Sequence, residues 1–469
     1  MKRKNYQSLE TEGRRLLTLA SDCWSSASSI RRRRRRCRDF AFGRQWLDPV
    51  SYRDRIMTEH EWIIEQGGNP MQNNLIGRLV RNVLGVFRKR MDEARPDLSA
   101  EQKQIEERNN MKELYCRTMQ DFLLSGMAVH RKWFGLREGT QGIWTNAVSP
   151  EVFFFNSDSR DPRGWDLTVV GQWHTVDFRG WCSEFVRTPD EYENALTLFP
   201  DGTGRQHIAE IWRREQRPRV LVHDPGEGRV YVYDVGETDD RLFKRNGLRS
   251  ANGDCRRCWF LDDVWRFYFV AEDGTLLRHG DSPYIHGGHP YIVKFYPFID
   301  GEIHSFVEDI IDQQKYTNHL ITMYDWAVRA SAKGVLLVPE GSVDDQNMDQ
   351  LCENWSRFDG VIRYKAKAGE AEPHQVAAGG KFPGISELLS IQLKMLEDVS
   401  GVTGTLQGNL SASTVSGTLY SQQTENALTS LRDLLSTFDS FIDDCRRLDK
   451  LLLRQAPLAG YQNDNITVS

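Results

Sequence analysis

Residues 300–334 read DGEIHSFVEDIIDQQKYTNHLITMYDWAVRASAKG, the most regular helical pattern in the chain. Apolar side chains recur there at spacings of three and four, at Ile303, Phe306, Val307, Ile310, Ile311, Leu320, Ile321, Tyr324 and Val328. Three polar residues, Gln314, Thr317 and Asn318, interrupt the stripe. Asp300 can cap the first turn. The pattern predicts a helix of about 30 residues, roughly 45 Å long.

The same spacing predicts helices on both sides of this stretch. They cover residues 8–43, 73–90, 101–130, 187–200, 385–402 and the segment from Leu428 to Leu452. Gly126 is expected to end the third of them. Between 143 and 178, and again between 207 and 298, runs of β-branched and aromatic residues bounded by Pro, Asp and Gly predict strands. The fold class is therefore α+β.

Charge is unevenly distributed along the 469 residues, although the net charge is only −5. Residues 1–100 hold 21 Lys and Arg against 12 Asp and Glu, whereas the remaining residues hold 40 against 54. A basic end and an acidic remainder favour charge-guided assembly over a wholly basic nucleic-acid-binding protein. The chain has no apolar run of the roughly 18–20 residues that a membrane-spanning helix requires, so no membrane partner is predicted.

Motifs of enzyme chemistry are missing from the sequence. Neither the phosphate-binding GxxxxGK[ST] nor the nucleophile motif GxSxG occurs. His60 begins HEWII, but Ile64 stands where the HExxH zinc motif requires a second histidine. Cys255 and Cys258 form a single CxxC without a second ligand pair, which favours free thiols in a reducing compartment. We therefore predict no catalytic residue, no cofactor and no metal site.

Two clusters leave alternatives open. His279, His286 and His289 could ligate a metal, but a Gly/Pro turn between strands is the interpretation we favour. The acidic residues 308, 309 and 312 could act as paired carboxylates, but on a helix they fall on the polar face.

Several segments carry recognisable motifs in a fixed order. Residues 38–96 contain Gly43-x-x-Trp46 and then an Asn- and Arg-bearing helix that ends in Arg-Pro. Residues 148–166, VSPEVFFFNSDSRDPRGWD, run a Pro-led strand into an Asp/Ser/Arg turn. Residues 289–323 include Asp312-Gln313-Gln314 and Asn318, and residues 396–435 follow with a small-residue loop and a helix. Together these segments resemble the portal (head-to-tail connector) proteins of tailed bacteriophages, especially those of short-tailed phages.

The resemblance implies a portal fold assembled as a ring, usually a dodecamer, at one vertex of the capsid. Its parts are a helical and β wing, stem helices, a β-rich clip and a C-terminal helical crown. On this chain the expected bounds are wing 1–235, first stem helix 236–250, clip 251–300, second stem helix 301–333, wing continuation 334–402 and crown 403–469.

The resemblance also implies the function and the partners. Double-stranded DNA would pass through the central channel during packaging and ejection, without sequence-specific contacts. The expected protein partners are further copies of the chain, the major capsid protein, the terminase large subunit and a head-tail adaptor protein. The expected location is the portal vertex of the virion, with the host cytoplasm during assembly.

Two sets of site residues follow from this placement. Residues 375–384, QVAAGGKFPG, occupy the position of the loop that narrows the channel, and Lys381 is its only charge, so we predict a phosphate contact there. The alternative is an ordinary surface lysine. Gln314, Thr317 and Asn318 are predicted to hydrogen-bond across a subunit interface, and the alternative is that they are merely exposed.

The arginine run is the remaining unusual feature; it consists of Arg31, Arg32, Arg33, Arg34, Arg35 and Arg36. On a helix these residues surround the axis, and Arg34 shares the apolar stripe of Ile30 and Cys37, where it must snorkel or meet a carboxylate. We predict an assembly face whose acidic partners come from the adjoining subunit, the capsid shell or a scaffolding protein. Nucleic acid and a solvated surface are the alternatives.

Two other functions remain as rivals. One is another virion assembly protein, a scaffold or core protein without a DNA channel, and the β-rich middle of the chain argues against it. The other is a phage nucleic-acid enzyme, which would need a carboxylate cluster or a phosphate loop.

Overall fold

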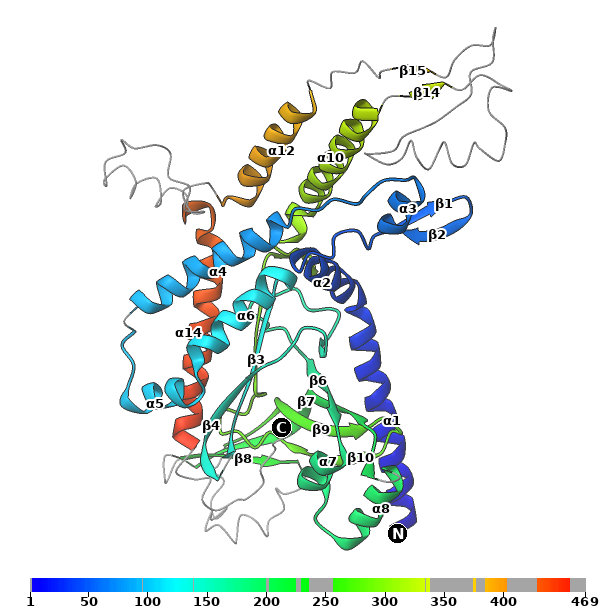
Figure 1. Cartoon of the computed structure of the whole chain (residues 1–469). Helices are drawn as coiled ribbons and strands as arrows, with labels where there is room; N and C mark the ends of the chain where they lie inside the picture. Colours follow the sequence, from blue (N-terminus) through cyan, green and yellow to red (C-terminus); the bar gives the residue numbers. More distant parts are fainter. Residues whose placement is uncertain are drawn as a thin grey trace. The chain divides into compact units, whose positions relative to one another are not determined.

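The computed structural model describes residues 2–94, 96–137, 139–199, 202–224, 229–235, 256–333, 335–337, 374–376, 384–402 and 428–455 (Figure 1). The chain forms two compact units. Unit 1 comprises residues 1–38, 79–309 and 404–469, and unit 2 comprises residues 39–78 and 310–403. Helix and sheet are both extensive, so the α+β prediction is confirmed.

The larger sheet of unit 1 is antiparallel with strand order β10-β9-β7-β6-β5, and β8 also pairs with β7. The strands are β5 (Phe153–Phe155), β6 (Val169–Val176), β7 (Gln206–Asp224), β8 (Arg229–Asp234), β9 (Arg256–Ala271) and β10 (Leu276–Asp281). The long strands β7 and β9 pair from Ile208 to His223, and β6 and β8 flank successive parts of β7.

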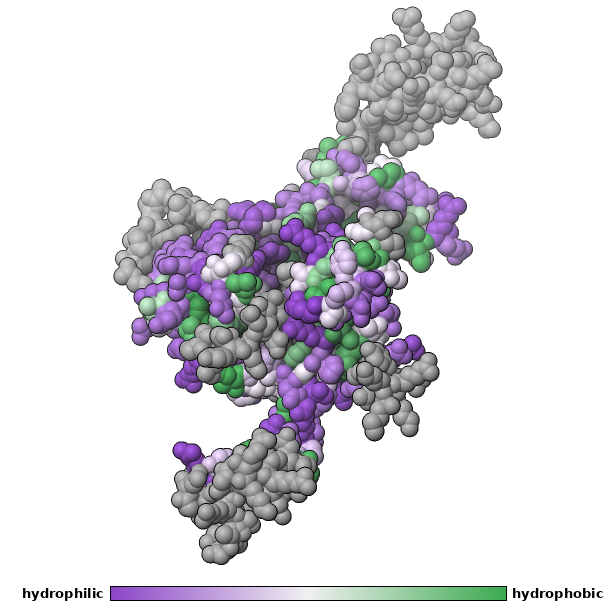
Figure 2. Space-filling view, turned by 90° about the horizontal axis from the view of Figure 1, so that it is seen from below, coloured by the Kyte–Doolittle hydropathy of each residue, from purple (hydrophilic) through white to green (hydrophobic). Residues whose placement is uncertain are grey.

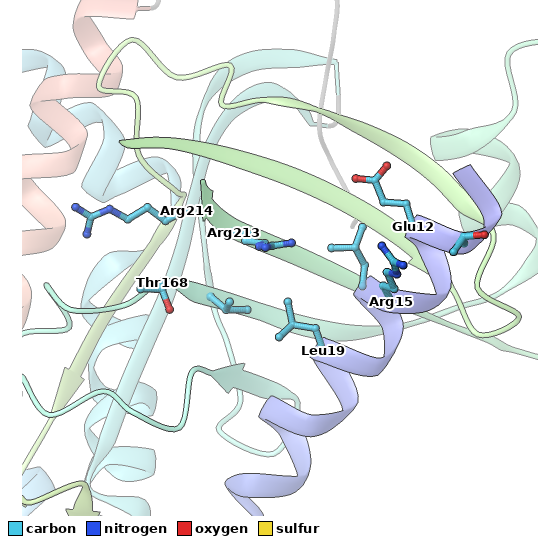
Figure 3. A pocket seen from close by; sticks show the side chains of 9 residues that line it. Glu12, Arg15, Leu19, Thr168, Arg213 and Arg214 are labelled. Carbon is cyan, nitrogen blue, oxygen red and sulfur yellow. The ribbon is translucent and has the colours of Figure 1, made fainter. Parts of the chain in front are cut away.

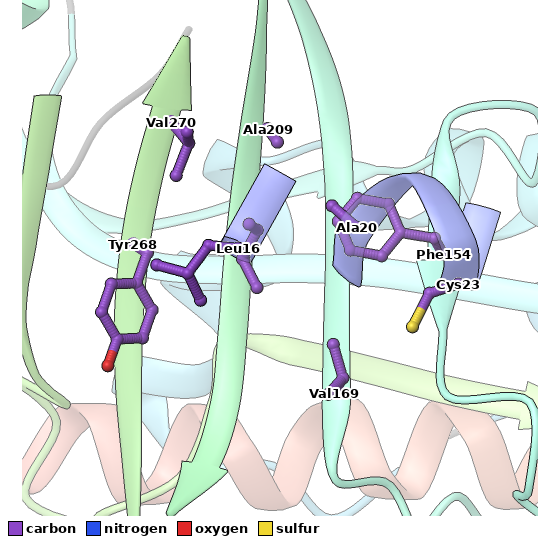
Figure 4. Packing of buried hydrophobic residues seen from close by; sticks show 9 residues of the cluster. Leu16, Ala20, Cys23, Phe154, Val169, Ala209, Tyr268 and Val270 are labelled. Atoms are coloured by element: carbon purple, nitrogen blue, oxygen red, sulfur yellow. The ribbon is translucent and has the colours of Figure 1, made fainter. Parts of the chain in front are cut away.

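Helix α1 (Lys2–Ser26) covers one face of this sheet. Leu16, Ala20 and Cys23 lie on one side of the helix and pack against apolar side chains of four strands, Phe154, Val169, Ala209, Ile211, Tyr268 and Val270 (Figure 4). Helix and sheet approach closely, because a Cβ atom at Gly13 would clash with the carbonyl oxygen of Gly274. This face is therefore a conventional apolar core between a helix and a sheet.

The opposite face of the sheet carries α7 (Phe178–Phe185), on which α8 (Pro189–Leu198) packs. The ring of Phe185 lies 5.7 Å from that of Phe269, whose side chain alternates to the face away from α1. Helix α8 begins with a capping box between Thr188 and Glu191 and has Pro189 in its first turn. Helix α7 is an addition that the sequence analysis missed.

A second sheet of unit 1 has the order β11-β3-β4 and packs against helices. Its strands are β3 (Met127–Arg137), β4 (Thr140–Ala147) and β11 (Tyr291–Phe295). The helices of this layer are α5 (Ala100–Arg108), α6 (Met111–Ser125) and α14 (Arg432–Gln455). Helix α14 crosses all three strands, and Lys132 Nζ of β3 donates to both carboxylate oxygens of Asp449 at 2.7 Å.

Unit 2 is built around α10 (Glu308–Lys333) and α12 (Ile385–Ser400), which lie side by side in Figure 1. Gln392 of α12 donates a hydrogen bond to Gln313 of α10. Strands β14 (Val335–Leu337) and β15 (His374–Val376) pair antiparallel after α10 and before α12. A hairpin of β1 (Pro49–Tyr52) and β2 (Arg55–Thr58) and the short helix α3 (Glu59–Glu65) complete the described part of this unit.

Two predicted helices are broken in the structure. Residues 8–43 form α1 and α2 (Ser28–Ala41), with a turn at Ala27. The predicted helix 101–130 forms α5 and α6, because Asn110 between them adopts a left-handed conformation with φ 46°. Gly126 ends α6 with φ 68°, which confirms that stop. Residues 73–90 form α4 (Leu75–Glu93) close to expectation.

The long predicted helix starts later than expected. Residues 298–303 form a short hairpin, β12 (Phe298–Ile299) and β13 (Glu302–Ile303), with Asp300 and Gly301 at φ 52° and 87° in its turn. Asp-Gly is the preferred pair for such a turn, and this preference overrides the helical spacing. Asp300 is therefore not the cap; Ser305 Oγ accepts the Glu308 N–H at 3.1 Å instead. Helix α10 has 26 residues, roughly 39 Å.

The expected division into wing, stem, clip and crown stays a prediction. The first stem helix, 236–250, lies outside the described residues. Within 251–300, β9 and β10 belong to the same sheet as β5 and β6, and β11 pairs with β3. None of the described helices is long and apolar enough to cross a membrane.

Candidate functional site

The polar interruption of α10 packs on the N-terminal turn of α4. Gln314 Oε1 accepts the N–H groups of Leu75 and Ile76 at 3.0 and 3.1 Å, and Gln314 Nε2 donates to Asn73 O at 2.7 Å. Asn74 Oδ1 accepts the Gly77 N–H at 2.9 Å. A helix start leaves its first N–H groups without intrahelical partners, so Gln314 and Asn74 together cap α4.

Asn318 continues this network one turn along α10. Its Oδ1 accepts from Gln314 Nε2 at 2.9 Å and from the Asn73 N–H at 3.2 Å, and its Nδ2 donates to Gln45 Oε1 at 2.7 Å. Thr317 donates to Gln313 O within the helix. Buried amides in a fully bonded network fix one register between helix and segment.

These contacts correct the prediction that Gln314, Thr317 and Asn318 bond to a neighbouring subunit. All three side chains are 0% exposed, and their hydrogen-bond partners described above lie in the same chain. The physical reason is that Gln314 of α10 caps the N-terminus of α4. Helical periodicity does not reveal that the first N–H groups of α4 need this acceptor. Contact between subunits along α10 stays a prediction, and it would have to use other side chains.

An ion triad lies beside this network. Lys315 Nζ lies 2.7 Å from both Asp48 Oδ2 and Glu59 Oε1. Burial would lower the pKa of Lys315, but hydrogen bonds to the two carboxylates raise it above its ordinary value. His319 on the next turn packs edge-on against Trp46 with ring centroids 5.0 Å apart. The triad ties the β1–β2 region to α10 within unit 2.

The outer surface of the helix pair is apolar. On α12 the exposed residues Leu388, Ile391, Met395 and Val399 follow at spacings of three and four, and each is 44–55% exposed. Exposed large side chains of α10 add to this surface, at Tyr316, Met323, Tyr324, Trp326 and Val328. An amphipathic helix normally turns such a stripe toward a core, so this stripe marks an interaction surface.

The arginine run lies on α2, and much of it is paired within unit 1. Arg34, 8% exposed, lies 2.6 Å from Asp121 and 3.4 Å from Glu151. Glu151 also pairs with Arg35. Of the two alternatives expected for Arg34, snorkelling to solvent or meeting a carboxylate, the structure shows the second. The expected source is corrected: these acids belong to the same chain, because α2 packs beside α6 and the segment that holds Glu151.

The other arginines of the run differ in their surroundings. Arg31 is 4% exposed and stacks over Trp24 with 3.7 Å from its guanidinium carbon to the ring centroid. Arg33 lies 3.8 Å from Glu308, and Arg32 is exposed. The run is therefore not one uniform face, and its role in assembly stays a prediction.

A buried Cys–His pair provides no nucleophile. Cys445 Sγ lies 3.6 Å from His130 Nδ1, and Thr118 Oγ1 lies 2.7 Å from the other ring nitrogen. Burial raises the pKa of Cys445 to about 12 and holds the pKa of His130 well below its ordinary value. Both groups are therefore neutral at pH 7, whereas catalysis requires a thiolate.

The three histidines that the sequence places close together, His279, His286 and His289, have separate surroundings in the structure. His289 is partly buried and its Nδ1 accepts the Tyr291 N–H, whereas His286 Nδ1 accepts the Gly288 N–H. His279 stacks on Tyr268 on a different strand. Within the described ranges no group of three His, Cys, Asp or Glu side chains could hold a metal ion.

The sequence analysis missed a buried charge network between β3 of the second sheet and β7 of the larger sheet. Arg131 and Glu210 are 1% and 0% exposed, with 3.1 Å between Arg131 Nη2 and Glu210 Oε1. Glu210 also bonds to His174 and to Trp212 Nε1. Burial alone would raise the pKa of Glu210, but Arg131 and His174 lower it to about 2. The sequence did hold a signal for this network, because a charged residue stands at an inward position of β3 and another at an inward position of β7.

Lys381 lies outside the described residues, so its predicted phosphate contact stays a prediction. The comparison with protein families gives one finding: the family described as Phage P22-like portal protein matches residues 17–448. No curated protein matches the chain.

Proposed function

The chain belongs to the phage P22-like portal protein family, and from this premise we propose that its copies form the ring that surrounds the DNA at the portal vertex. Proteins of this family are structural rather than enzymatic. Membership of the family implies a ring that has the capsid, the terminase and DNA as partners. The finer elements of the proposal are a dodecamer, docking of the terminase large subunit and then of a head-tail adaptor, and assembly in the host cytoplasm.

The apolar stripe of α12 carries the proposal of a ring. Leu388, Ile391, Met395 and Val399 remain about half exposed in the single chain. Full burial of each such side chain contributes about 1.5–3 kcal/mol, so a partner that covered all four would gain several kcal/mol. In a ring, a second copy of the same helix pair supplies that cover all the way around.

We assign the stem to α10 and α12 and the clip to the connection between them, 334–383. The paired strands β14 and β15 support this assignment, because they bring the chain back from the end of α10 to the start of α12. It differs from the bounds expected from the sequence, in which 251–300 is the clip. The pairing of β9 and β10 with β7 favours the revision.

Passage of DNA through the channel is proposed on electrostatic grounds. Every phosphate that a Lys or Arg neutralises adds affinity through counterion release, so a strongly basic lumen would hold DNA in place. The excess of Asp and Glu beyond residue 100 supports a channel with few basic contacts. Lys381 lies within 334–383, so on this assignment its proposed phosphate contact belongs to the clip part of the channel rather than to a loop that narrows it.

Imaging of the purified protein tests the ring directly. Wild type is expected to form rings with a central hole by negative-stain microscopy and a single large species by sedimentation. Ile391→Asp places a charge in the stripe and should shift the population to smaller species. Ser390→Asp, on the side of α12 away from the stripe, is the matched control and should assemble normally. Wild type that stays monomeric at high concentration would refute the proposal.

A further inference from the structure

A groove runs between α1 and the larger sheet of unit 1, with a volume of about 840 Å³ (Figure 3). Its floor is apolar, formed by Leu16, Leu19 and Val169, and Arg15, Arg213 and Arg214 stand at its sides. The charged residues that line it are all exposed, unlike those of a buried small-molecule pocket. The groove therefore resembles half of a protein interface.

The arginines of the groove differ in how they are neutralised. Arg214 pairs with Asp263 at 2.5 Å, and Arg213 lies 4.0 Å from Glu215. Among the residues that the structure describes, Arg15 forms no ion pair. Glu12 is the one acid in the lining, so the groove keeps a positive balance. An acidic surface with a small apolar part would complement it.

Helix α8 of the same unit presents such a surface. Tyr192 and Leu196, four residues apart, are 45% and 46% exposed. Glu193 is exposed and falls on the same side of the helix, and Asp190 is exposed next to that side. Ala195, three residues after Tyr192, is buried, and the Tyr192 ring lies 6.1 Å from that of Phe178 on α7, so the exposed part of Tyr192 borders the contact between the two helices. Helix α8 thus shows two apolar side chains beside carboxylates.

The two surfaces lie on opposite faces of one sheet. Helix α1 covers the face with Tyr268 and Val270, whereas α7 and α8 belong to the face with Phe269. Two different but complementary surfaces on opposite sides of one subunit make a head-to-tail contact. Such contacts repeat from copy to copy, and they close into a ring if the rotation between neighbouring copies adds up to a full turn. A surface that met its own copy would instead give a twofold dimer.

Figure 2 shows mainly hydrophilic residues, with small hydrophobic patches between them, on the face seen from below. A contact between the groove and α8 would combine ion pairs with modest apolar burial. It would guide the register of neighbours more than it would supply affinity.

We propose that α8 of one copy docks into the α1 groove of the next, with Tyr192 and Leu196 on the apolar floor and Glu193 facing Arg15. This inference rests on the proposed ring, and it names a contact in unit 1 that is separate from the α12 stripe of unit 2.

Charge reversal tests the pairing. Arg15→Glu and Glu193→Arg should each slow ring assembly several-fold at low salt, measured by sedimentation, and the double variant should recover at least half of the lost rate. Arg179→Glu, an exposed charge reversal on neighbouring α7, is the control and should assemble at the wild-type rate. Each variant's thermal unfolding shows that the subunit is folded. Loss in both single variants without recovery in the double variant would overturn the pairing.

A cysteine pair tests the geometry independently. Leu19→Cys together with Leu196→Cys should give a ladder of disulfide-linked chains on oxidation of assembled rings, and either substitution alone should not. Rings that form normally but give no ladder would overturn this inference while leaving the ring intact. Failure of the wild type to form rings would overturn both.

Discussion

A single buried amide links the two most regular helices of the sequence. Gln314 lies in the middle of α10, yet its oxygen accepts two N–H groups at the start of α4 and its nitrogen bonds to Asn73 and Asn318. A buried donor or acceptor that loses its partner costs about 1–3 kcal/mol. Gln314 is therefore a residue of the fold rather than of the subunit boundary.

Removal of this amide is expected to destabilise the chain strongly. Gln314→Ala should lower the free energy of unfolding by about 2–4 kcal/mol, because two N–H groups of α4 lose their acceptor inside the protein. Denaturant unfolding of the isolated subunit measures the change. Gln104→Ala, on the exposed side of α5, is the control and should change stability by less than about 0.5 kcal/mol. Equal effects in both variants would contradict the capping role.

The lowered pKa of the partly buried His289 predicts a stability loss in mild acid. Burial, together with repulsion from His286, lowers the pKa of His289 from 6.5 to about 4. Below pH 6.5 the unfolded chain takes up a proton that the folded chain refuses, so stability falls as pH drops from 6.5 toward 4. The contribution is about 2 kcal/mol between pH 7 and pH 5.

Urea unfolding at the two pH values checks this expectation. His289→Gln should make the loss of stability between pH 7 and pH 5 smaller than in the wild type, while His130, whose pKa is also depressed, continues to contribute. His207→Gln replaces an exposed histidine whose ring bonds to Thr175 and is the control. An unchanged slope in His289→Gln would show that the imidazole is not responsible.

At the scale of elements, α2 shows how a run of like charges is accommodated. Seven arginines within fourteen residues would repel one another on an isolated helix. The structure places Glu151, Asp121 and Glu308 around it, and Trp24 under Arg31. The helix is thus partly neutralised by its own chain before any partner binds.

Two substitutions separate stability from assembly on α2. Arg34→Gln should lower the free energy of unfolding by about 1–3 kcal/mol, less than for a fully buried pair because Asp121 and Glu151 are about one quarter exposed. Arg32→Gln should leave subunit stability unchanged, since Arg32 is exposed.

Assembly is the second measurement for these two variants. If the outer side of α2 contacts a partner, Arg32→Gln should weaken ring or procapsid formation without a stability change. Wild-type assembly in this variant would leave the arginine run with a role inside the subunit alone.

In the whole molecule, each of the two units carries one set of the proposed subunit contacts. Unit 2 holds the helix pair with the exposed stripe, and unit 1 holds the two sheets, the groove and α8. A ring built from both sets of contacts is expected to lose assembly gradually when one set is weakened. Salt should weaken the contact through Arg15 and Glu193 more than the contact through the α12 stripe.

DNA retention is the test that belongs to the assembled molecule. Lys381→Ala should leave rings intact and reduce packaging or retention of DNA, because one phosphate contact per subunit is lost. Lys394→Ala, an exposed lysine of α12, is the control in the described part of the chain. Unchanged packaging by Lys381→Ala at every salt concentration would remove the proposed contact.

The sequence alone determined the fold class, most of the strands and helices, and the portal family. These follow from local periodicity, turn residues and the order of motifs, which lie within short stretches of chain. It also left two alternatives for Arg34, snorkelling or a carboxylate partner, since a charge on an apolar stripe has few other solutions.

Only the tertiary structure decided which partners the polar residues use. Gln314 meets a helix start more than two hundred residues earlier, Arg34 meets Glu151, and Arg131 of one sheet meets Glu210 of the other. The Asp-Gly turn at 300–301 likewise prevailed over helical spacing once β12 and β13 paired. Hydrogen bonds and ion pairs depend on distances between atoms that are remote along the chain, and periodicity carries no record of those distances.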